Sequence, residues 1–299
     1  MRVFVTGATG FIGSAVVGEL LEAGHTVVGL ARSDQAAANL AAAGAAVHRG
    51  SLTDLDSLRA GAAAADGVIH TAYIHDFSPT GDPAAAARTD GQAIQALGET
   101  LAGSGRPLVV ASGIALLAPG RLVTEEDNLP DDLPHPRVSE QVALQFAGRA
   151  VRVSVMRLPP SVHGQGDHGF VPGLIGIARA KGLAAYVGDG SNRWAAVHRL
   201  DAARLFRLAL ESAPAGTRLH AVGDEGVPFR DIAAVIGRHL DLPVTSISRE
   251  EADGHFGGFA LFASMDVPAS SAITQQRFGW HPVQPGLIAD LDEGHYFTA

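Results

Sequence analysis

The segment VFVTGATGFIG, residues 3–13, decides the fold. It opens with an apolar run that predicts a β-strand, and three glycines then follow at a spacing of three. Such glycines let the backbone turn tightly beside a pyrophosphate, while the first N–H groups of the next helix point at the anion. The segment therefore predicts a dinucleotide-binding turn made by Thr6, Gly7, Thr9, Gly10, Phe11, Ile12 and Gly13.

The residues after this turn support a strand–helix–strand unit. Apolar residues recur at helical spacing from Ile12 to Leu21, and the β-branched run Thr26-Val27-Val28 begins two residues beyond Gly24. The alternative is a glycine turn that merely packs a helix on a sheet, and this context disfavours it.

Composition excludes several classes of function. The 299 residues include 31 acidic and 22 basic side chains, and the net charge of −9 gives no general attraction for nucleic acid or anionic lipid. No long uncharged apolar run or signal peptide is present, so no membrane association is expected. The absence of cysteine excludes disulfides and thiolate chemistry and fits a cytoplasmic protein. The 13 histidines are scattered, so no metal site is expected.

Apolar strands alternate with alanine-rich helical stretches through the first half of the chain. The expected helices cover about 34–44, 54–65, 84–103 and 139–149, and strands lie between them. This order predicts an α/β fold with a doubly wound parallel sheet. Glycine and proline punctuation increases after Pro160, so we expect a dinucleotide-binding domain at 1–158 and a smaller substrate-binding region at 159–299, with about 197–224 returning to the first domain.

The end of the second expected strand bears on the choice of cofactor. An acidic residue there would bind the ribose 2′-OH of NAD, whereas an arginine suits the 2′-phosphate of NADP. Ala31 stands at the acidic position, and Arg32 and Ser33 follow it. NADP is therefore favoured over NAD; the alternative is that Arg32 is solvated and Asp34 binds the ribose.

Several motifs resemble those of the short-chain dehydrogenase/reductase superfamily, in the extended and atypical branch called the NAD-dependent epimerase/dehydratase family. The resemblance covers nearly the whole chain and is carried by TGATGFIG at 6–13, VIHTA at 68–72, Ser112-Gly113, MRLP through HG at 156–164, and VHRLD at 197–201. It implies a Rossmann fold, and cofactor contacts from Thr71, Ala72 and the Ser51-Leu52 pair, where Ser51 replaces the family's Asp. It also implies a homodimer joined through exposed alanine and leucine faces near 84–103 and 139–149.

The resemblance fails at the usual catalytic pair. Family members carry a Tyr that exchanges a proton with the substrate and, four residues later, a Lys. Alignment puts Pro136 at the Tyr position and Glu140 at the Lys position, and the three tyrosines, Tyr73, Tyr186 and Tyr296, lie elsewhere. The standard proton relay is absent.

Three interpretations follow from this loss. The first retains hydride transfer to a small-molecule substrate and takes the proton from the loop that holds Tyr73, His75 and Asp76, through a histidine with a pKa near neutrality or a phenol made acidic by its neighbours. The second is a dinucleotide-binding sensor without catalysis. The third, a sugar-nucleotide epimerase or dehydratase, is disfavoured because those reactions use the missing Tyr.

Two further side chains are candidates for the same site. Ser112 matches the family serine that hydrogen-bonds a substrate carbonyl, although a turn serine is the alternative. Arg137 is preferred to His135 as an anion ligand, because a guanidinium can replace contacts of the lost Lys. A protonated imine or a conjugated alkene asks less of an acid than a ketone does, so the loss of the Tyr favours C=N or C=C reduction. The expected activity is NADPH-dependent reduction of a small, largely apolar substrate.

The second region offers weaker candidates. Arg193 and Trp194 could bind an anionic or aromatic group, and the apolar run 256–262 could line a substrate cavity. A surface or packing role is the alternative for each.

Overall fold

The computed structural model describes residues 1–75, 81–129 and 137–298. Its main sheet has seven strands in the order β10-β6-β5-β4-β1-β2-β3, and every neighbouring pair is parallel. This confirms the predicted doubly wound α/β fold. The strands are β1 (Arg2–Thr6), β2 (Thr26–Ala31), β3 (Ala46–Arg49), β4 (Gly67–His70), β5 (Pro107–Gly113), β6 (Arg152–Leu158) and β10 (Thr217–His220).

Helices cover both faces of this sheet. Alternate residues of β1 point to opposite faces: Val3 and Val5 join one buried cluster and Phe4 joins another. The first cluster is closed by α1 (Phe11–Glu22), α2 (Asp34–Ala42) and α7 (Arg199–Ser212), and the second by α3 (Leu55–Ala63), α4 (Pro83–Leu101) and α5 (Ser139–Leu144). The two cores are formed by residues from elements far apart in the sequence.

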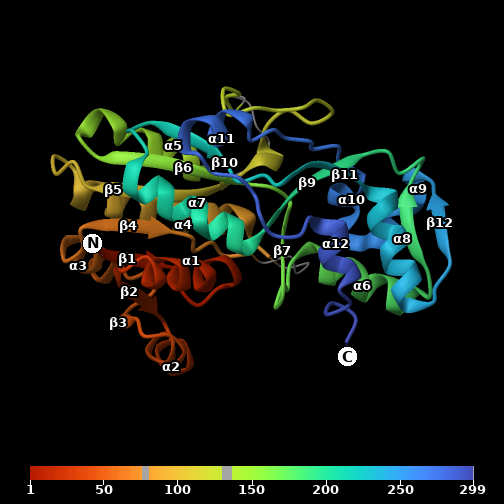
Figure 1. Cartoon of the computed structure of the whole chain (residues 1–299), viewed down its shortest axis with the longest axis horizontal. Coiled ribbons are helices and arrows are strands. Elements are labelled where there is room, and N and C mark those ends of the chain that lie inside the picture. The colour runs from red at the N-terminus through yellow and green to blue at the C-terminus, as the bar shows by residue number, and fades with distance from the viewer. Residues whose placement is uncertain (76–80, 130–136, 299) are drawn as a thin grey trace.

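A smaller mixed region lies at the other end of the long axis (Figure 1). Its three-stranded sheet has the order β11-β9-β7, with β11 antiparallel to β9, and a parallel pair joins β12 to β8. Its elements are β7 (Ser161–His163), α6 (Phe170–Lys181), β8 (Ala184–Val187), β9 (Arg193–His198), β11 (Asp224–Pro228), α8 (Phe229–Leu240), β12 (Val244–Ile247), α9 (Arg249–Phe256), α10 (Ala260–Ser264) and α12 (Leu287–Asp292).

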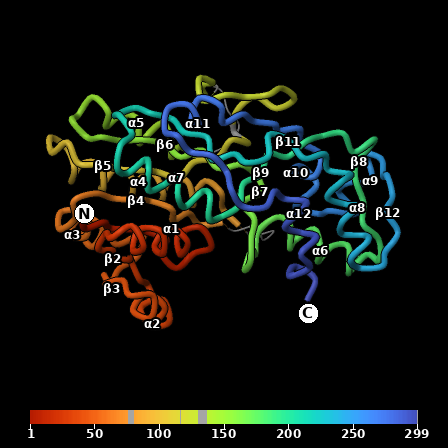
Figure 2. Tube along the Cα trace, viewed as in Figure 1, coloured from red at the N-terminus to blue at the C-terminus, as the bar shows by residue number. Residues whose placement is uncertain are grey.

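The chain passes between the two parts more than once, as the trace in Figure 2 shows. Helix α7 packs on α1 and β10 pairs with β6, so residues after β9 return to the first sheet. Helix α11 (Ala272–Phe278) lies beside β10, where Thr274 Oγ1 accepts from His220 N at 3.0 Å. The exact division at residues 158 and 159 stays a prediction.

No helix in the described ranges is both long and apolar enough to cross a bilayer. The expected helices of the first half are all present, although the stretch at 139–149 is split into α5 and a short 3₁₀ turn at Ala147–Arg149.

Candidate functional site

The glycine turn between β1 and α1 has the geometry that the sequence predicts. Gly7 has φ +70°, and a Cβ there would lie 2.7 Å from Ala72 N. A Cβ on Gly13 would lie 2.0 Å from Gly7 O, so both positions must be glycine. A Cβ on Gly10 would meet only Gly7 O, at 3.2 Å, so this residue presents bare backbone outward.

Helix α1 begins at this turn without a side-chain cap and without an acidic residue in its first turn. Its first N–H groups therefore lack intrahelical partners and carry the positive end of the helix dipole. A pyrophosphate fits such a cradle, because it supplies both the negative charge and the acceptors. Phe11 and Ile12, expected as cofactor contacts, are the first two residues of this helix.

Thr71 and Ala72 lie directly against the turn. Both the amide N–H and the hydroxyl of Thr71 donate to Thr6 O, at 3.2 and 2.8 Å. The Thr71 side chain is therefore used to hold the end of β4 against the end of β1. Its expected contact with the cofactor stays a prediction.

The ends of β2 and β3 carry two arginines around Ser33. Arg32 is exposed, and Ser33 caps α2 by accepting from Ala36 N at 3.2 Å. Asp34, the alternative ribose ligand, pairs with Arg49 at 2.7 Å. We did not single out Arg49 from the sequence. Its position at the end of β3, the strand next to β2, is the signal that would have identified it.

Ser51 and Leu52 follow β3 at the same edge of the sheet. Both are partly exposed, and the hydroxyl of Ser51 hydrogen-bonds that of Thr53 at 3.0 Å. Their adenine contacts stay a prediction.

A buried chain of hydrogen bonds runs from the glycine turn toward the proposed catalytic loop. Thr6 Oγ1 lies 2.8 Å from His70 Nδ1, and His70 Nε2 lies 3.0 Å from Asp90 Oδ1. The Ser139 hydroxyl donates to Asp90 Oδ2 at 2.6 Å and accepts from Arg137 Nε at 2.9 Å. The sequence missed His70, Asp90 and Ser139, which link β4, α4 and α5 into one support for Arg137.

Arg137 joins Tyr73 to the end of β5. Its guanidinium lies 4.2 Å from the centroid of the Tyr73 ring, and its Nη2 donates to Ala111 O at 3.1 Å. His75 lies next to Tyr73, with its ring centroid 4.9 Å from that of the Tyr73 ring. The structure thus brings three of the predicted catalytic residues together. Asp76 and His135 lie outside the described residues.

The protonation states differ from those that the sequence predicted. Desolvation raises the pKa of the Tyr73 phenol, against the opposing effect of the Arg137 charge. Partial desolvation lowers the pKa of His75, and the Arg137 charge lowers it further. The expected acidic phenol is therefore wrong: Tyr73 is a protonated donor at neutral pH, and His75 is neutral.

Ser112 follows Ala111 on β5 and is buried. Its hydroxyl finds no hydrogen-bond partner in the part of the chain that the structure describes. A buried hydroxyl without a partner is costly, so this atom is a candidate to bind a ligand oxygen.

Glu140, at the position of the lost Lys, is turned toward β6 and β10. Its carboxylate accepts from Arg157 at 2.6 and 2.8 Å and from Arg218 Nε at 2.7 Å. Burial alone would disfavour the carboxylate, but the two guanidinium groups hold the pKa of Glu140 below its ordinary value. Glu140 is a structural residue here. The sequence signal for it was Arg157, which stands next to the apolar residues Val155, Met156 and Leu158 in β6.

The candidates in the second region are structural as well. Trp194 is a core residue at 1% exposure, with its ring packed on Phe229 at 5.1 Å. Arg193 forms a two-point ion pair with Asp266, at 2.9 and 2.8 Å. These side chains are therefore not available together for an anionic or aromatic ligand. Phe256 is buried in the same core, where it borders a small cavity together with Leu174 and Phe229. The expected substrate cavity at 256–262 stays a prediction.

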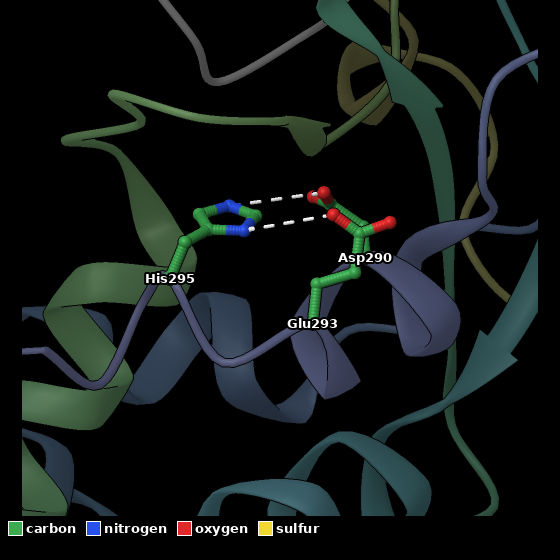
Figure 3. Close-up of side chains that lie close together, drawn as sticks. All are labelled: Asp290, Glu293 and His295. Carbon is green, nitrogen blue, oxygen red and sulfur yellow. Dashed lines mark ion pairs between the residues drawn. The ribbon is translucent and has the colours of Figure 1, made fainter.

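One group of side chains among the described residues has the spacing of a metal site. Asp290, Glu293 and His295 bring one ligand atom each within 4.8 Å of the others (Figure 3). However, His295 faces Asp290 through Nε2 at 3.7 Å and Glu293 through Nδ1 at 4.0 Å. Asp290 also binds His163 Nδ1 at 2.8 Å. These contacts place one histidine between two carboxylates, one of which already pairs with His163.

Comparison with known proteins gives relatives of two kinds. The chain is 53% identical over 299 residues to the uncharacterized protein C2A9.02 of Schizosaccharomyces pombe. The alignment covers 99% of this chain and 100% of the relative. It is 30% identical over 232 residues to a 4-hydroxy-2-methyl-3-oxo-4-farnesyl-3,4-dihydroquinoline-1-oxide ketoreductase of Stigmatella aurantiaca, covering 72% of this chain and 66% of the relative.

The fold also matches solved structures of the same architecture. The dTDP-glucose 4,6-dehydratase DesIV from Streptomyces venezuelae superposes with a TM-score of 0.79 at 20% identity, over 99% of this chain and 97% of that one. The model of the NAD dependent epimerase/dehydratase family matches residues 3–222. With the glycine turn, the parallel sheet and this match agreeing over most of its length, the chain belongs to the NAD dependent epimerase/dehydratase family.

Proposed function

We propose that this protein is an NADPH-dependent reductase that acts on a C=O, C=N or C=C bond of a small, largely apolar substrate without the usual Tyr/Lys pair. The observation that carries the proposal is the Arg137–Tyr73 stack, held from behind by Ser139 and Asp90. It lies at the carboxyl ends of β4 and β5, where ligands bind in this fold. The ketoreductase among the relatives supports a reductive chemistry.

The dinucleotide would be held at three places along this edge. The N-terminal N–H groups of α1 would bind the pyrophosphate. Arg32 and Arg49 would flank a 2′-phosphate, because Arg49 already offsets the charge of Asp34. When bound, the reduced nicotinamide supplies the hydride.

The proton would come from Tyr73. Its phenol is protonated at neutral pH and donates to the substrate oxygen or nitrogen, or to the carbon next to the reduced one in a C=C bond. The phenolate left behind is stabilised by the charge of Arg137, which already lies over the ring. The Ser112 hydroxyl would donate a hydrogen bond to a substrate carbonyl and so gain the partner that it lacks among the described residues.

The deciding experiment has two stages. The purified protein is first titrated with NADPH and NADH, and then assayed with ketones, imines and enones. Turnover of any class supports the reductase and names its substrate class. Tight cofactor binding without turnover would favour the alternative, a dinucleotide-binding sensor, which the raised pKa of Tyr73 and the structural use of Glu140 both permit.

A cytoplasmic location and a homodimer remain part of the proposal. Ile94, Leu97 and Leu101 of α4 are buried within the chain, so these apolar residues are not part of an exposed face. The expected dimer interface near 84–103 and 139–149 stays a prediction. The exposed side of α4 carries Arg88, Gln92 and Glu99. Sedimentation analysis of the purified protein measures the oligomeric state directly.

A further inference from the structure

Arg199 lies where two helices present their positive ends. It is the first residue of α7, and its guanidinium lies 4.8 Å from the ring centroid of Phe11, the first residue of α1. Because helix N-termini carry partial positive charge, a cation is disfavoured at such a position. Helix α7 carries Asp201 in its first turn, whereas α1 has no acidic residue there, so Arg199 adds its charge to the uncompensated positive end of α1 at the glycine turn.

Nothing with a negative charge in the described residues offsets this arginine. Its Nη1 donates to Gln165 O at 2.9 Å and its Nη2 to Ser14 Oγ at 3.3 Å, and both acceptors are neutral. No carboxylate of the described ranges lies within ion-pair distance of it, and burial lowers its pKa. Arg207, two turns further along α7, shows the contrast, because it pairs with Glu19 and Glu211 at 2.6 and 3.0 Å.

The turn at 164–166 packs on both His198 and Arg199. Gly164 has φ +130°, and a Cβ there would lie 2.8 Å from His198 Nε2 and 3.1 Å from Arg199 Cγ. A Cβ on Gly166 would lie 3.6 Å from Arg199 Nη1. Arg199 therefore has backbone on one side, the Phe11 ring on another, and the uncapped start of α1 next to it. An anion at the start of α1 would supply the missing negative charge.

We infer that Arg199 binds the pyrophosphate of the dinucleotide, with its guanidinium on the side of the anion opposite the N–H groups of the glycine turn. The inference rests on the proposed dinucleotide binding and adds to it a residue some 190 positions away in the sequence. Bound in this way, the pyrophosphate links α1, α7 and the turn at 164–166. The two phosphoryl groups then meet a guanidinium, which suits them better than a lysine because it donates from several N–H groups in one plane.

This role has a signature that distinguishes it from a contact to the 2′-phosphate. Every ligand with a pyrophosphate should depend on Arg199 to the same degree, whether it is NADPH, NADH or ADP-ribose. AMP, which has a single phosphate, should depend on it less. Arg32, by contrast, should affect NADPH alone.

The test is isothermal titration of wild type, Arg199→Met and Arg199→Lys with NADPH, NADH, ADP-ribose and AMP, with Arg207→Met as the matched control on the same helix. We expect Arg199→Met to weaken all three pyrophosphate ligands by roughly tenfold or more, and Arg199→Lys to recover part of the loss. The affinity of Arg207→Met for each of these ligands should stay within about twofold of wild type. Melting of the free proteins should show no larger loss for Arg199→Met than for Arg207→Met, since the first removes unbalanced positive charge.

The possible failures are separable. If wild type binds all three pyrophosphate ligands and Arg199→Met binds them equally well, Arg199 is only a packing residue and the inference is overturned while the proposed function stands. If wild type binds none of them, both are overturned. A loss of affinity confined to NADPH would also overturn the inference, because it would show that Arg199 contacts the 2′-phosphate.

Discussion

Tyr73 keeps its proton because partial burial raises the pKa of its phenol. Arg137, 4.2 Å from the ring centroid, acts in the opposite direction by favouring the phenolate. Replacing Tyr73 by Phe leaves the ring on which the guanidinium lies and removes only the hydroxyl. We expect kcat for the substrate found by the assay panel to fall by about 10²- to 10⁴-fold, the usual size of a general-acid contribution. The dissociation constant of NADPH should not change. Steady-state kinetics and fluorescence titration measure the two quantities.

The control for this variant is Tyr186→Phe, since Tyr186 is partly buried in the core of the second region, away from Arg137. Its kcat should equal that of wild type. A kcat for Tyr73→Phe within about twofold of wild type would remove Tyr73 from the mechanism.

Arg32 is exposed at the end of β2, and its expected role concerns the cofactor alone. Arg32→Ala should raise the dissociation constant of NADPH roughly tenfold and leave that of NADH unchanged, because only NADPH carries the 2′-phosphate. Arg59→Ala, an exposed arginine that pairs with Asp56 on α3, serves as the control. Equal losses for both cofactors would show that Arg32 does not read the 2′-phosphate.

Helix α5 is fixed to the sheet by Glu140, whose carboxylate lies between Arg157 and Arg218. Removing one partner of a buried ion pair leaves the other charge uncompensated. Glu140→Gln should therefore lower the free energy of unfolding by on the order of 3 kcal/mol. Urea unfolding measures this change. Glu99→Gln, on the exposed side of α4, should lie within about 0.5 kcal/mol of wild type.

The same position offers a sharper comparison. Glu140→Lys restores the residue type that family members carry, but it places a third cation beside Arg157 and Arg218. We expect little folded protein. A folded Glu140→Lys variant with higher kcat would show that this position faces the cofactor after all.

The elements show how far sequence reasoning reaches. The glycine turn, the parallel order and the helices follow from local patterns, since periodicity and turn glycines are properties of neighbouring residues. The buried chain from His70 to Arg137 does not, because Asp90 and Ser139 meet only after α4 and α5 pack together. One signal was present: Asp90 lies in the apolar stripe of α4, with Ala86 and Ala93 on the same side. A carboxylate in such a stripe requires a buried partner.

Charge inside the whole molecule also couples its parts. His220 on β10 is fully buried, with Nδ1 donating to Ser270 O at 2.9 Å and Nε2 facing Arg157 Nη1 at 3.3 Å. Burial, aided by the Arg157 charge, lowers the pKa of His220 to about 4. Through these contacts the neutral imidazole of His220 connects β10 to Arg157 of β6 and to the segment at Ser270.

This imidazole makes the stability of the folded protein depend on pH. Below the ordinary histidine pKa of 6.5 the unfolded chain takes up a proton, and the folded protein does so only near pH 4. The free energy of unfolding should therefore fall as the pH is lowered from about 6.5 to about 4, by on the order of 3 kcal/mol from this residue. Urea unfolding at pH 7, 6 and 5 measures the slope.

Other histidines contribute to that slope, because desolvation lowers the pKa of His198 and of His255 as well. The informative comparison is thus between variants. His220→Gln should be less stable than wild type at pH 7, since its buried partners lose the ring, yet its stability should fall less steeply toward pH 5. His255→Gln, at a more accessible residue on α9, should flatten the slope far less. Identical slopes for wild type and His220→Gln would mean that folding does not shift the pKa of His220, because carboxylates such as Glu125 and Glu140 offset the effect of burial.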